Sequence, residues 1–281
     1  MSDYLDLLMK QYHQEDLVEK ILLSLREHQL DLENLSRDDL RALDEFHIKG
    51  RRGTLELAEL AGVEEGMKIL DIGCGIGGPA RTLVEHFDCK VVGLDIIQSY
   101  CNVAELLTLK TGLEEKATFM QGDALQLPFD DASFDMVWIQ HLSMNIPDKQ
   151  LMFEEIYRVL RKGGKLALFE VCSGSQEKPY YPVPWADDAS ISYPISSKKL
   201  RRLIREQGFK EQRWLDVSDS SLAWFMRQIE RAELQKQDET QKTKPGIQLL
   251  MGENTSLKMK NVVRNLEEDR IRVIQAVFYK Q

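Results

Sequence analysis

The sequence predicts an α/β fold in which a mostly parallel sheet carries helices on both faces. From Met67 onward, short apolar runs alternate with helical segments at the spacing typical of βαβ units. The first of these runs, Met67–Ile72, is followed by a glycine-rich loop that opens a helix. The chain has 281 residues, which is enough for one large domain or two small ones.

Seven strands are expected along the chain. They are Met67–Ile72, Lys90–Leu94, Ala117–Met120, Phe134–Ile139, Lys165–Val171, about Phe209–Val217, and Arg272–Tyr279. The helices between them are expected where apolar residues recur every three or four positions, as in Ser99–Lys110. A helix that Pro147 and Asp148 open is expected to stop at the Gly163–Gly164 pair. Because consecutive parallel strands need covered faces, we expect a sheet buried between two helical layers.

Three parts of the chain are expected to have different roles. Residues 1–53 read as helices, with apolar stripes such as Leu17, Ile21 and Leu25, and we expect them to pack over the ligand-binding edge of the sheet. Residues 54–171 form the βαβ core. Residues 172–281 complete the same sheet and carry two insertions, 172–196 and 221–268, which we expect to form a cap.

The composition excludes several classes of protein. The chain has 37 Lys and Arg against 46 Asp and Glu, a net charge of −9, so nucleic acid is not an expected partner. No apolar run is long enough to span a membrane, and no secretory signal is evident. The four cysteines show no CxxC spacing, and the five histidines show no ligand-spaced cluster. We therefore expect reduced thiols, a cytoplasmic location and no metal.

The loop after the first strand carries the strongest functional signal. Gly73, Gly75 and Gly78 have the GxGxxG spacing, and Asp95 ends the second strand about 20 residues later. In a strand–loop–helix context this pattern indicates nucleotide binding, because glycines let the backbone approach a ligand closely. A carboxylate at the tip of the second strand can accept hydrogen bonds from both ribose hydroxyls.

Asp71 separates two ligands that this loop could bind. A dinucleotide brings a pyrophosphate to the helix N-terminus, and a carboxylate at that point would repel it. S-adenosylmethionine brings an ammonium and a sulfonium instead, and both suit Asp71. After the third strand, Asp123 can accept the adenine amino group beside the amide of Ala124. The three acids at successive strand ends favour S-adenosylmethionine, although acids at strand ends also occur as ordinary turn residues.

On these residues the sequence resembles the class I methyltransferases over about residues 45–171. The resemblance rests on LDIGCGIGGPARTL, VVGLDI, QGDALQLPF, FDMVW and EIYRVLRKGGKLAL. A closer resemblance, through LDEFHIKGRRGTLELAELAG and Trp138–Lys149, is to the sarcosine/dimethylglycine N-methyltransferases and the tocopherol and quinone methyltransferases. It implies a Rossmann-like, seven-stranded, mostly parallel sheet whose last strand is antiparallel, with N-terminal helices and a helical cap.

The resemblance also implies a set of cofactor contacts. Carried over onto this sequence, they fall on Asp71, Gly73, Gly75, Asp95, Ile96, Asp123, Ala124 and Gln140, with Phe46 and His47 closing over the methionine end. A packed aromatic and a helix-terminal histidine are the alternative explanation for Phe46 and His47. The implied activity is methyl transfer from S-adenosylmethionine to a small molecule by in-line displacement. A non-catalytic S-adenosylmethionine-binding protein is an alternative, and Asp71 disfavours an NAD-dependent oxidoreductase.

His141 follows the fourth strand and is the expected catalytic base, unless it is only a packed or surface histidine. The amine-methylating and tocopherol enzymes tend to carry an acid at the position of His141 and a histidine at that of Asn145. This departure weakens the expectation of a substrate ammonium and leaves phenols, quinols, acidic carbons and neutral amines open.

Aromatic residues in the two insertions are expected to contact the acceptor. Tyr181, Trp185 and Trp224 are the predicted substrate residues, and packing of the insertions onto the sheet is the alternative explanation. The neighbouring Arg51 and Arg52 would bind a substrate carboxylate or form a solvated pair.

Overall fold

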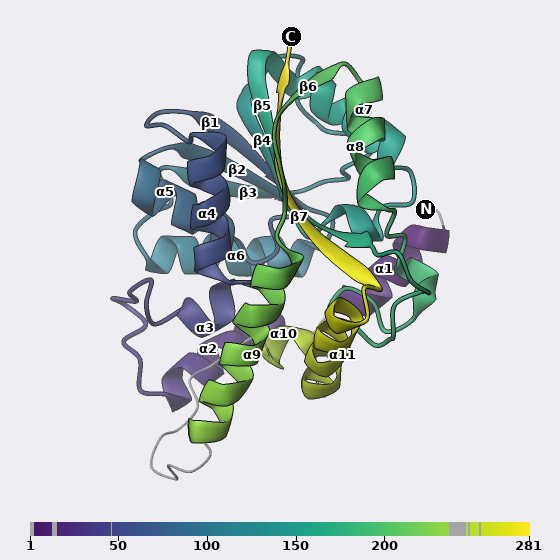
Figure 1. Ribbon diagram of the computed structural model, residues 1–281. Coiled ribbons are helices and arrows are strands. Elements are labelled where there is room, and N and C mark those ends of the chain that lie inside the picture. Colours follow the sequence, from purple (N-terminus) through teal and green to yellow (C-terminus); the bar gives the residue numbers. More distant parts are fainter. Residues whose placement is uncertain (1–2, 13–15, 46, 236–245, 247, 253) are drawn as a thin grey trace.

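The computed structural model describes residues 3–12, 16–45, 47–235, 246, 248–252 and 254–281 (Figure 1). A seven-stranded sheet has the order β3-β2-β1-β4-β5-β7-β6. Its strands are β1 (Lys68–Ile72), β2 (Lys90–Asp95), β3 (Ala117–Gln121), β4 (Phe134–Gln140), β5 (Leu160–Ser173), β6 (Phe209–Asp216) and β7 (Ile271–Lys280). Strands β1 to β5 are parallel, and β7 pairs antiparallel with both β5 and β6. The predicted sheet and its antiparallel last strand are confirmed.

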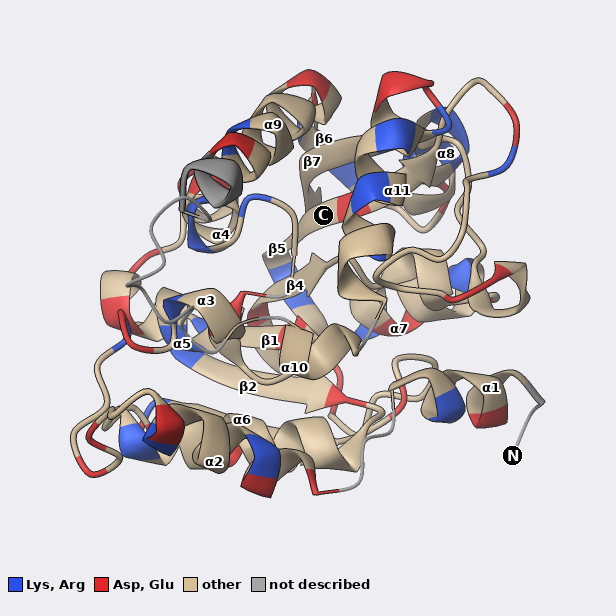
Figure 2. Ribbon diagram, turned by 90° about the horizontal axis from the view of Figure 1, so that it is seen from below, with Lys and Arg blue, Asp and Glu red and all other residues tan. Residues whose placement is uncertain are grey.

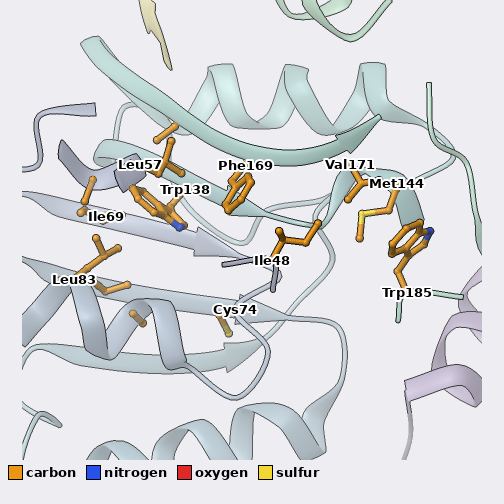
Figure 3. Packing of buried hydrophobic residues seen from close by; sticks show 14 of the residues in the cluster. Ile48, Leu57, Ile69, Cys74, Leu83, Trp138, Met144, Phe169, Val171 and Trp185 are labelled. Atoms are coloured by element: carbon orange, nitrogen blue, oxygen red, sulfur yellow. The ribbon is translucent and has the colours of Figure 1, made fainter. Parts of the chain in front are cut away.

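Helices cover both faces of the sheet, as predicted. On one face lie α4 (Arg51–Ala61), α5 (Gly78–Phe87) and α6 (Gln98–Lys110), and on the other lie α7 (Lys149–Val159) and α8 (Ser197–Glu206) (Figure 1). Each face has its own buried cluster. Leu57, Leu83 and Trp138 belong to the first cluster (Figure 3), and Phe153 and Ile204 belong to the second. Removing this apolar surface from water stabilises the two layers against the sheet.

One predicted boundary was wrong. The helix expected to run to Gly163 ends at Val159, and β5 begins at Leu160 and continues through both glycines. Leu160 pairs with Phe134 of β4, and the register then shifts before Met136 pairs with Lys165. Pairing with β4 therefore extends this strand five residues before the predicted start, because hydrogen bonds between strands override the local turn signal of the two glycines.

The N-terminal helices lie at the carboxyl end of the parallel strands (Figure 1). Figure 2 shows the molecule from below, so that this end faces the viewer. These helices are α1 (Asp3–Tyr12), α2 (Leu17–Glu27) and the short α3 (Arg41–Asp44). The predicted stripe of α2 is buried against Val103 and Leu107 of α6. This packing fixes the N-terminal segment to the core beside the glycine-rich loop.

The two C-terminal insertions gather at the same end of the sheet (Figure 1). Residues 174–196 form a loop with one short 3₁₀ helix, Ala189–Ile191. After β6 come α9 (Ser218–Gln235), α10 (Gln248–Met251) and α11 (Thr255–Glu267), where the sequence predicted one helical stretch.

Candidate active site

A cavity of about 150 Å³ opens at the carboxyl ends of β1, β2 and β4; we call it the cofactor cavity. The predicted cofactor residues that the structure describes all line it: His47, Asp71, Gly73, Gly75, Asp95, Ile96, Asp123, Ala124 and Gln140. Phe46 lies outside the described residues. The cavity is thus built from the ends of strands that are distant in sequence, at the edge where ligands bind in open α/β sheets.

The glycine-rich loop turns sharply over the end of β2. Gly73 and Gly75 have φ values of 74° and 53°, which glycine adopts at little cost. The Gly73 amide donates to the carbonyl oxygen of Leu94 at 2.7 Å, and the Gly75 amide donates to Asp95 Oδ2 at 2.9 Å. Gly78 has a different role, because a Cβ there would lie 1.8 Å from the carbonyl oxygen of Asp44. The third glycine of the motif therefore allows the backbone of the N-terminal segment to pack directly against the start of the following helix.

Asp71 is the most unusual group in the cofactor cavity. Its side chain is buried, and its Oδ2 atom has no hydrogen-bond partner among the described residues. Burial, with the nearby charges of Asp95 and Glu45, raises the pKa of Asp71 to about 8. An unpartnered buried carboxyl group fits a cationic ligand group, such as the ammonium of S-adenosylmethionine, because a nearby cation favours its ionised form, whereas a nearby pyrophosphate would oppose that ionisation.

Asp95 and Asp123 keep acceptor capacity for a ligand. Asp95 accepts one backbone hydrogen bond on each oxygen, from Gly75 and from Ile97, both at 2.9 Å. Asp123 Oδ1 accepts from the Leu125 amide at 2.8 Å. Each carboxylate oxygen can accept two hydrogen bonds, so both residues can also bind hydroxyl or amino groups of an adenosine.

A buried hydrogen-bond network ties the N-terminal segment to β4. The Trp138 indole donates to Gln140 Oε1 at 2.7 Å, and Thr54 donates to the same oxygen at 3.3 Å. His47 Nε2 lies 2.6 Å from Glu45 Oε2. Burial opposes ionisation of Glu45, but hydrogen bonds and charges, above all those of His47, lower its pKa to about 2. Gln140 and His47 are thus held at the cavity wall by partners that the sequence pattern did not single out.

His141 has a fixed orientation and a strained backbone, with a φ of 55°. Its Nδ1 lies 2.9 Å from the carbonyl oxygen of Phe169, and its Nε2 accepts a long hydrogen bond from the Ile48 amide at 3.4 Å. Nδ1 therefore carries the proton in the neutral ring. Burial, followed by the charge of His47, lowers the pKa of His141 to about 3. Nε2 is consequently an unprotonated acceptor at neutral pH.

The loop after β4 is held by hydrogen bonds of Asn145, a role that the sequence pattern did not predict for this residue. Asn145 Nδ2 donates to the carbonyl oxygens of Trp185 and Ile191, at 2.8 and 2.9 Å. The Tyr12 hydroxyl donates to Asn145 Oδ1 at 3.2 Å. The asparagine that departs from the related enzymes therefore joins α1, the β4 loop and the 174–196 insertion. The only indication of this role in the sequence was the position of Asn145 within the Trp138–Lys149 motif.

A larger cavity, of about 970 Å³, adjoins the first and shares His47, His141, Pro184 and Trp185 with it. We call it the second cavity. Of the predicted substrate residues, Trp185 lines both cavities and Trp224 lines the second. Tyr181 lines neither of them and packs against the hydrophobic core. His47 and His141 therefore mark the junction of the two cavities.

The described residues contain neither a cluster arranged to bind a metal ion nor a helix able to span a membrane. Within them, no group of three or more His, Cys, Asp or Glu side chains has the arrangement of a metal site. No described helix combines the length and the apolar character needed to cross a bilayer.

Comparison with known proteins assigns the core. Residues 70–168 match the family model described as a methyltransferase domain. The sterol 24-C-methyltransferase erg6 of Aspergillus fumigatus is 41% identical over 114 residues, which are 41% of this chain and 30% of that protein. The chain covers less than half the length of this relative and of two further curated relatives.

Solved structures share the fold over the whole chain. A Haemonchus contortus phosphoethanolamine N-methyltransferase 2, in complex with S-adenosyl-L-methionine, matches with a TM-score of 0.73 at 20% identity, covering 100% of this chain and 60% of that one. The [4+2]-cyclase SpnF matches with a TM-score of 0.68 at 21% identity, covering 100% and 97%.

The fold and the cavity at the carboxyl edge thus define a protein with the class I methyltransferase architecture. Within this architecture residues 70–168, about a third of the chain, match the methyltransferase domain model. The prediction of S-adenosylmethionine, rather than a nicotinamide dinucleotide, agrees with this assignment.

Proposed function

We propose that the protein transfers a methyl group from S-adenosylmethionine to a small-molecule acceptor by in-line displacement. The observation that carries the proposal is the unpartnered buried carboxyl group of Asp71, in a cavity that adjoins a second, larger one. The first cavity suits the cofactor and the second suits the acceptor. His47 and His141 lie where the two ligands would meet.

Each end of the cofactor has a group that suits it. Asp71 and the glycine-rich loop would hold the methionine end, and Asp95 would bind the ribose hydroxyls. Asp123 and Ala124 would bind the adenine. His47, which lines both cavities, and Gln140, whose Nε2 lies 3.5 Å from His47 Nδ1, would border the methyl group. The division into an N-terminal cover, a cofactor core and a C-terminal cap is supported by the residues that these parts supply to the cavities.

The chemistry asks mainly for positioning. When bound, S-adenosylmethionine supplies a methyl group on a sulfonium that is already a good leaving group. Holding the acceptor lone pair in line with that methyl group can supply about 7–11 kcal/mol. His141 Nε2 can orient the acceptor by accepting its hydrogen bond in place of the long one from the Ile48 amide, because this nitrogen has a single lone pair. General-base catalysis adds about 10²–10⁴-fold only where the acceptor must lose a proton.

The partners and the location follow the same reasoning. The acceptor is a small molecule, since the insertions and the N-terminal segment line the second cavity together, and nucleic acid is not an expected partner of so acidic a chain. A cytoplasmic location is supported by four cysteines that are buried and free of disulfides.

Calorimetric titration with S-adenosylmethionine, S-adenosylhomocysteine and NAD tests the cofactor, and the first two are expected to bind. Formation of S-adenosylhomocysteine, screened across amines, phenols, quinols and carbon acids, tests the reaction. Binding of NAD alone would show the proposal to be wrong. Binding of S-adenosylmethionine with no turnover of any acceptor would instead indicate a non-catalytic binding protein.

A further inference from the structure

Part of the lining of the second cavity is apolar. Its residues come from the 174–196 loop and from α9, α10 and α11, and we call them the apolar wall: Trp185, Trp224, Phe225, Met251, Met259 and Val262. Trp224 and Phe225 pack edge to face, with ring centroids 4.9 Å apart. Two aromatic side chains on α9 and flexible methionines on α10 and α11 suit a ring or a hydrocarbon chain.

Another part of the lining of the same cavity is basic. Five cationic side chains line it, and we call them the basic rim: Arg41, Lys49, Arg51, Arg52 and Arg227. The carboxylates that line the cavity are Asp38 and Glu45. The excess of cations runs against the net charge of −9 on the whole chain. A local concentration of one sign of charge in a cleft favours a ligand of the opposite sign.

Three of the five cations are already paired. Lys49 and Arg52 both contact Glu56, at 2.9 and 2.7 Å. Arg51 contacts Asp38 at 3.2 Å. These carboxylates neutralise part of the charge of the rim and hold the three side chains in place.

Arg41 and Arg227 differ from the other three cations. Both are exposed, and neither forms an ion pair with any residue that the structure describes. Glu45 forms an ion pair with neither of them, and its two oxygens bind His47, Thr54 and Thr82 instead. The guanidinium groups from α3 and α9 therefore remain available at the mouth of the cavity.

We propose that the methyl acceptor is an amphipathic anion. Its apolar body packs against the apolar wall, its carboxylate or phosphate group binds the basic rim through Arg41 and Arg227, and its reacting atom lies near His47 and His141. A cationic acceptor is disfavoured, because the unpaired Arg41 and Arg227 repel it. This inference rests on the proposed function and specifies its substrate class.

Four naphthalene probes test the charge preference: 1-naphthoate, 1-naphthyl phosphate, 1-naphthalenemethanol and 1-naphthylmethylammonium. Each is titrated calorimetrically into the protein saturated with S-adenosylhomocysteine. At least one anion is expected to bind about tenfold more tightly than the neutral alcohol, because hydrogen bonds to a charged group are the stronger ones. The ammonium is expected to bind more weakly than the alcohol. The two anions distinguish a carboxylate site from a phosphate site.

Two double variants test whether Arg41 and Arg227 cause the preference for anionic probes. Arg41→Gln with Arg227→Gln is expected to remove most of the preference for the anion and to leave S-adenosylhomocysteine binding unchanged. Arg202→Gln with Arg213→Gln is the matched control, since it removes the same charge from exposed positions on α8 and β6 that line neither cavity. Trp224→Ala is expected to weaken the alcohol and the anions alike, because it removes apolar contact.

The outcomes separate this inference from the proposed function. Equal binding of the four probes, no binding of either anion, or an anion preference that survives the loss of Arg41 and Arg227 would overturn the inference. Each of those results leaves cofactor binding intact. A protein that fails to bind S-adenosylhomocysteine would contradict the proposed function itself.

Discussion

Burial moves the pKa values of two ionisable residues of the cofactor cavity in opposite directions, and both become neutral. The pKa of Asp71 is raised to about 8 and the pKa of His141 is lowered to about 3, in each case mainly because burial removes water from the side chain. The unliganded site therefore keeps a protonated carboxyl group and a neutral imidazole at pH 7. A bound cation changes this balance, since it favours the ionised form of Asp71.

The first prediction concerns the pH dependence of cofactor binding. If Asp71 ionises when it meets the ammonium, the affinity for S-adenosylmethionine rises by up to about tenfold per pH unit below the pKa of about 8. Titration in buffers of different ionisation enthalpy should detect release of a proton. Asp71→Asn is the control, because it keeps all other titrating groups. The same pH dependence in wild type and variant would rule out this role for Asp71.

The second prediction concerns His141. His141→Asn should lower kcat by at most about 10²-fold for an acceptor that loses a proton, and much less for one that does not, because a base with a pKa of about 3 is far from the optimum near the working pH. Asparagine tolerates the left-handed backbone at this position better than most residues. Because the pKa of His141 is about 3, the wild-type pH–rate profile should show no inflection from this residue near pH 6.5. An unchanged kcat for every acceptor, with steady-state kinetics as the measurement, would leave His141 without a catalytic role.

Among the secondary-structure elements, the close approach of α5 to the N-terminal segment governs the site. The start of α5 meets the carbonyl group of Asp44, and the carboxylate of Asp44 is paired with Arg37 and with Arg81 of α5. The side chains of Asp44 and Arg81 are fully buried. Truncating one member would leave a buried charge without its partner, which is costly. This contact places α3 and His47 beside the glycine-rich loop.

The third prediction tests this contact. Gly78→Ala should destabilise the protein by about 1–3 kcal/mol or more, because the added methyl group overlaps the backbone of Asp44. Urea denaturation gives the change in the free energy of unfolding. The affinity for S-adenosylmethionine should also fall, since the N-terminal segment must shift. A variant as stable as the wild type would mean that α5 and the N-terminal segment separate easily.

For the whole molecule, the buried acids link stability to pH. Asp71 and Glu170 have folded-state pKa values of about 8 and about 7, above their values in the unfolded chain. The folded protein therefore binds protons that the unfolded chain has released, and its stability falls as pH rises through this range. His141 acts in the opposite direction, because its pKa is lowered, but only below its unfolded value of 6.5.

The fourth prediction follows from these signs. Between pH 6.5 and pH 8, where the contribution of His141 is complete, the free energy of unfolding of the unliganded protein should decrease. Asp71→Asn should reduce this decrease, since the asparagine does not titrate. Urea denaturation at the two pH values measures the effect. A wild-type protein that becomes more stable over this interval would show that Asp71 is already ionised in the unliganded fold.

Much of the fold was predictable because it depends on local patterns. Apolar runs such as Phe134–Ile139 correspond closely to buried strands, and the glycine spacing marks the loop whose positive φ values only glycine adopts easily. Strand limits were less predictable, as β5 shows. The separation of Tyr12 from Asn145 by 133 positions explains why that hydrogen bond has no local signature.

The sequence by itself determined the order of the strands along the chain, the glycine-rich loop and the acids at the strand ends, since each depends on neighbouring residues. The tertiary structure alone decided that Gly78 serves packing, that Asn145 joins three segments and that Tyr181 lies outside both cavities. It also brought Arg41 and Arg227 to one cavity from opposite ends of the chain. The physical reason is that burial and ion pairing depend on distances in space, which folding sets between residues far apart in sequence.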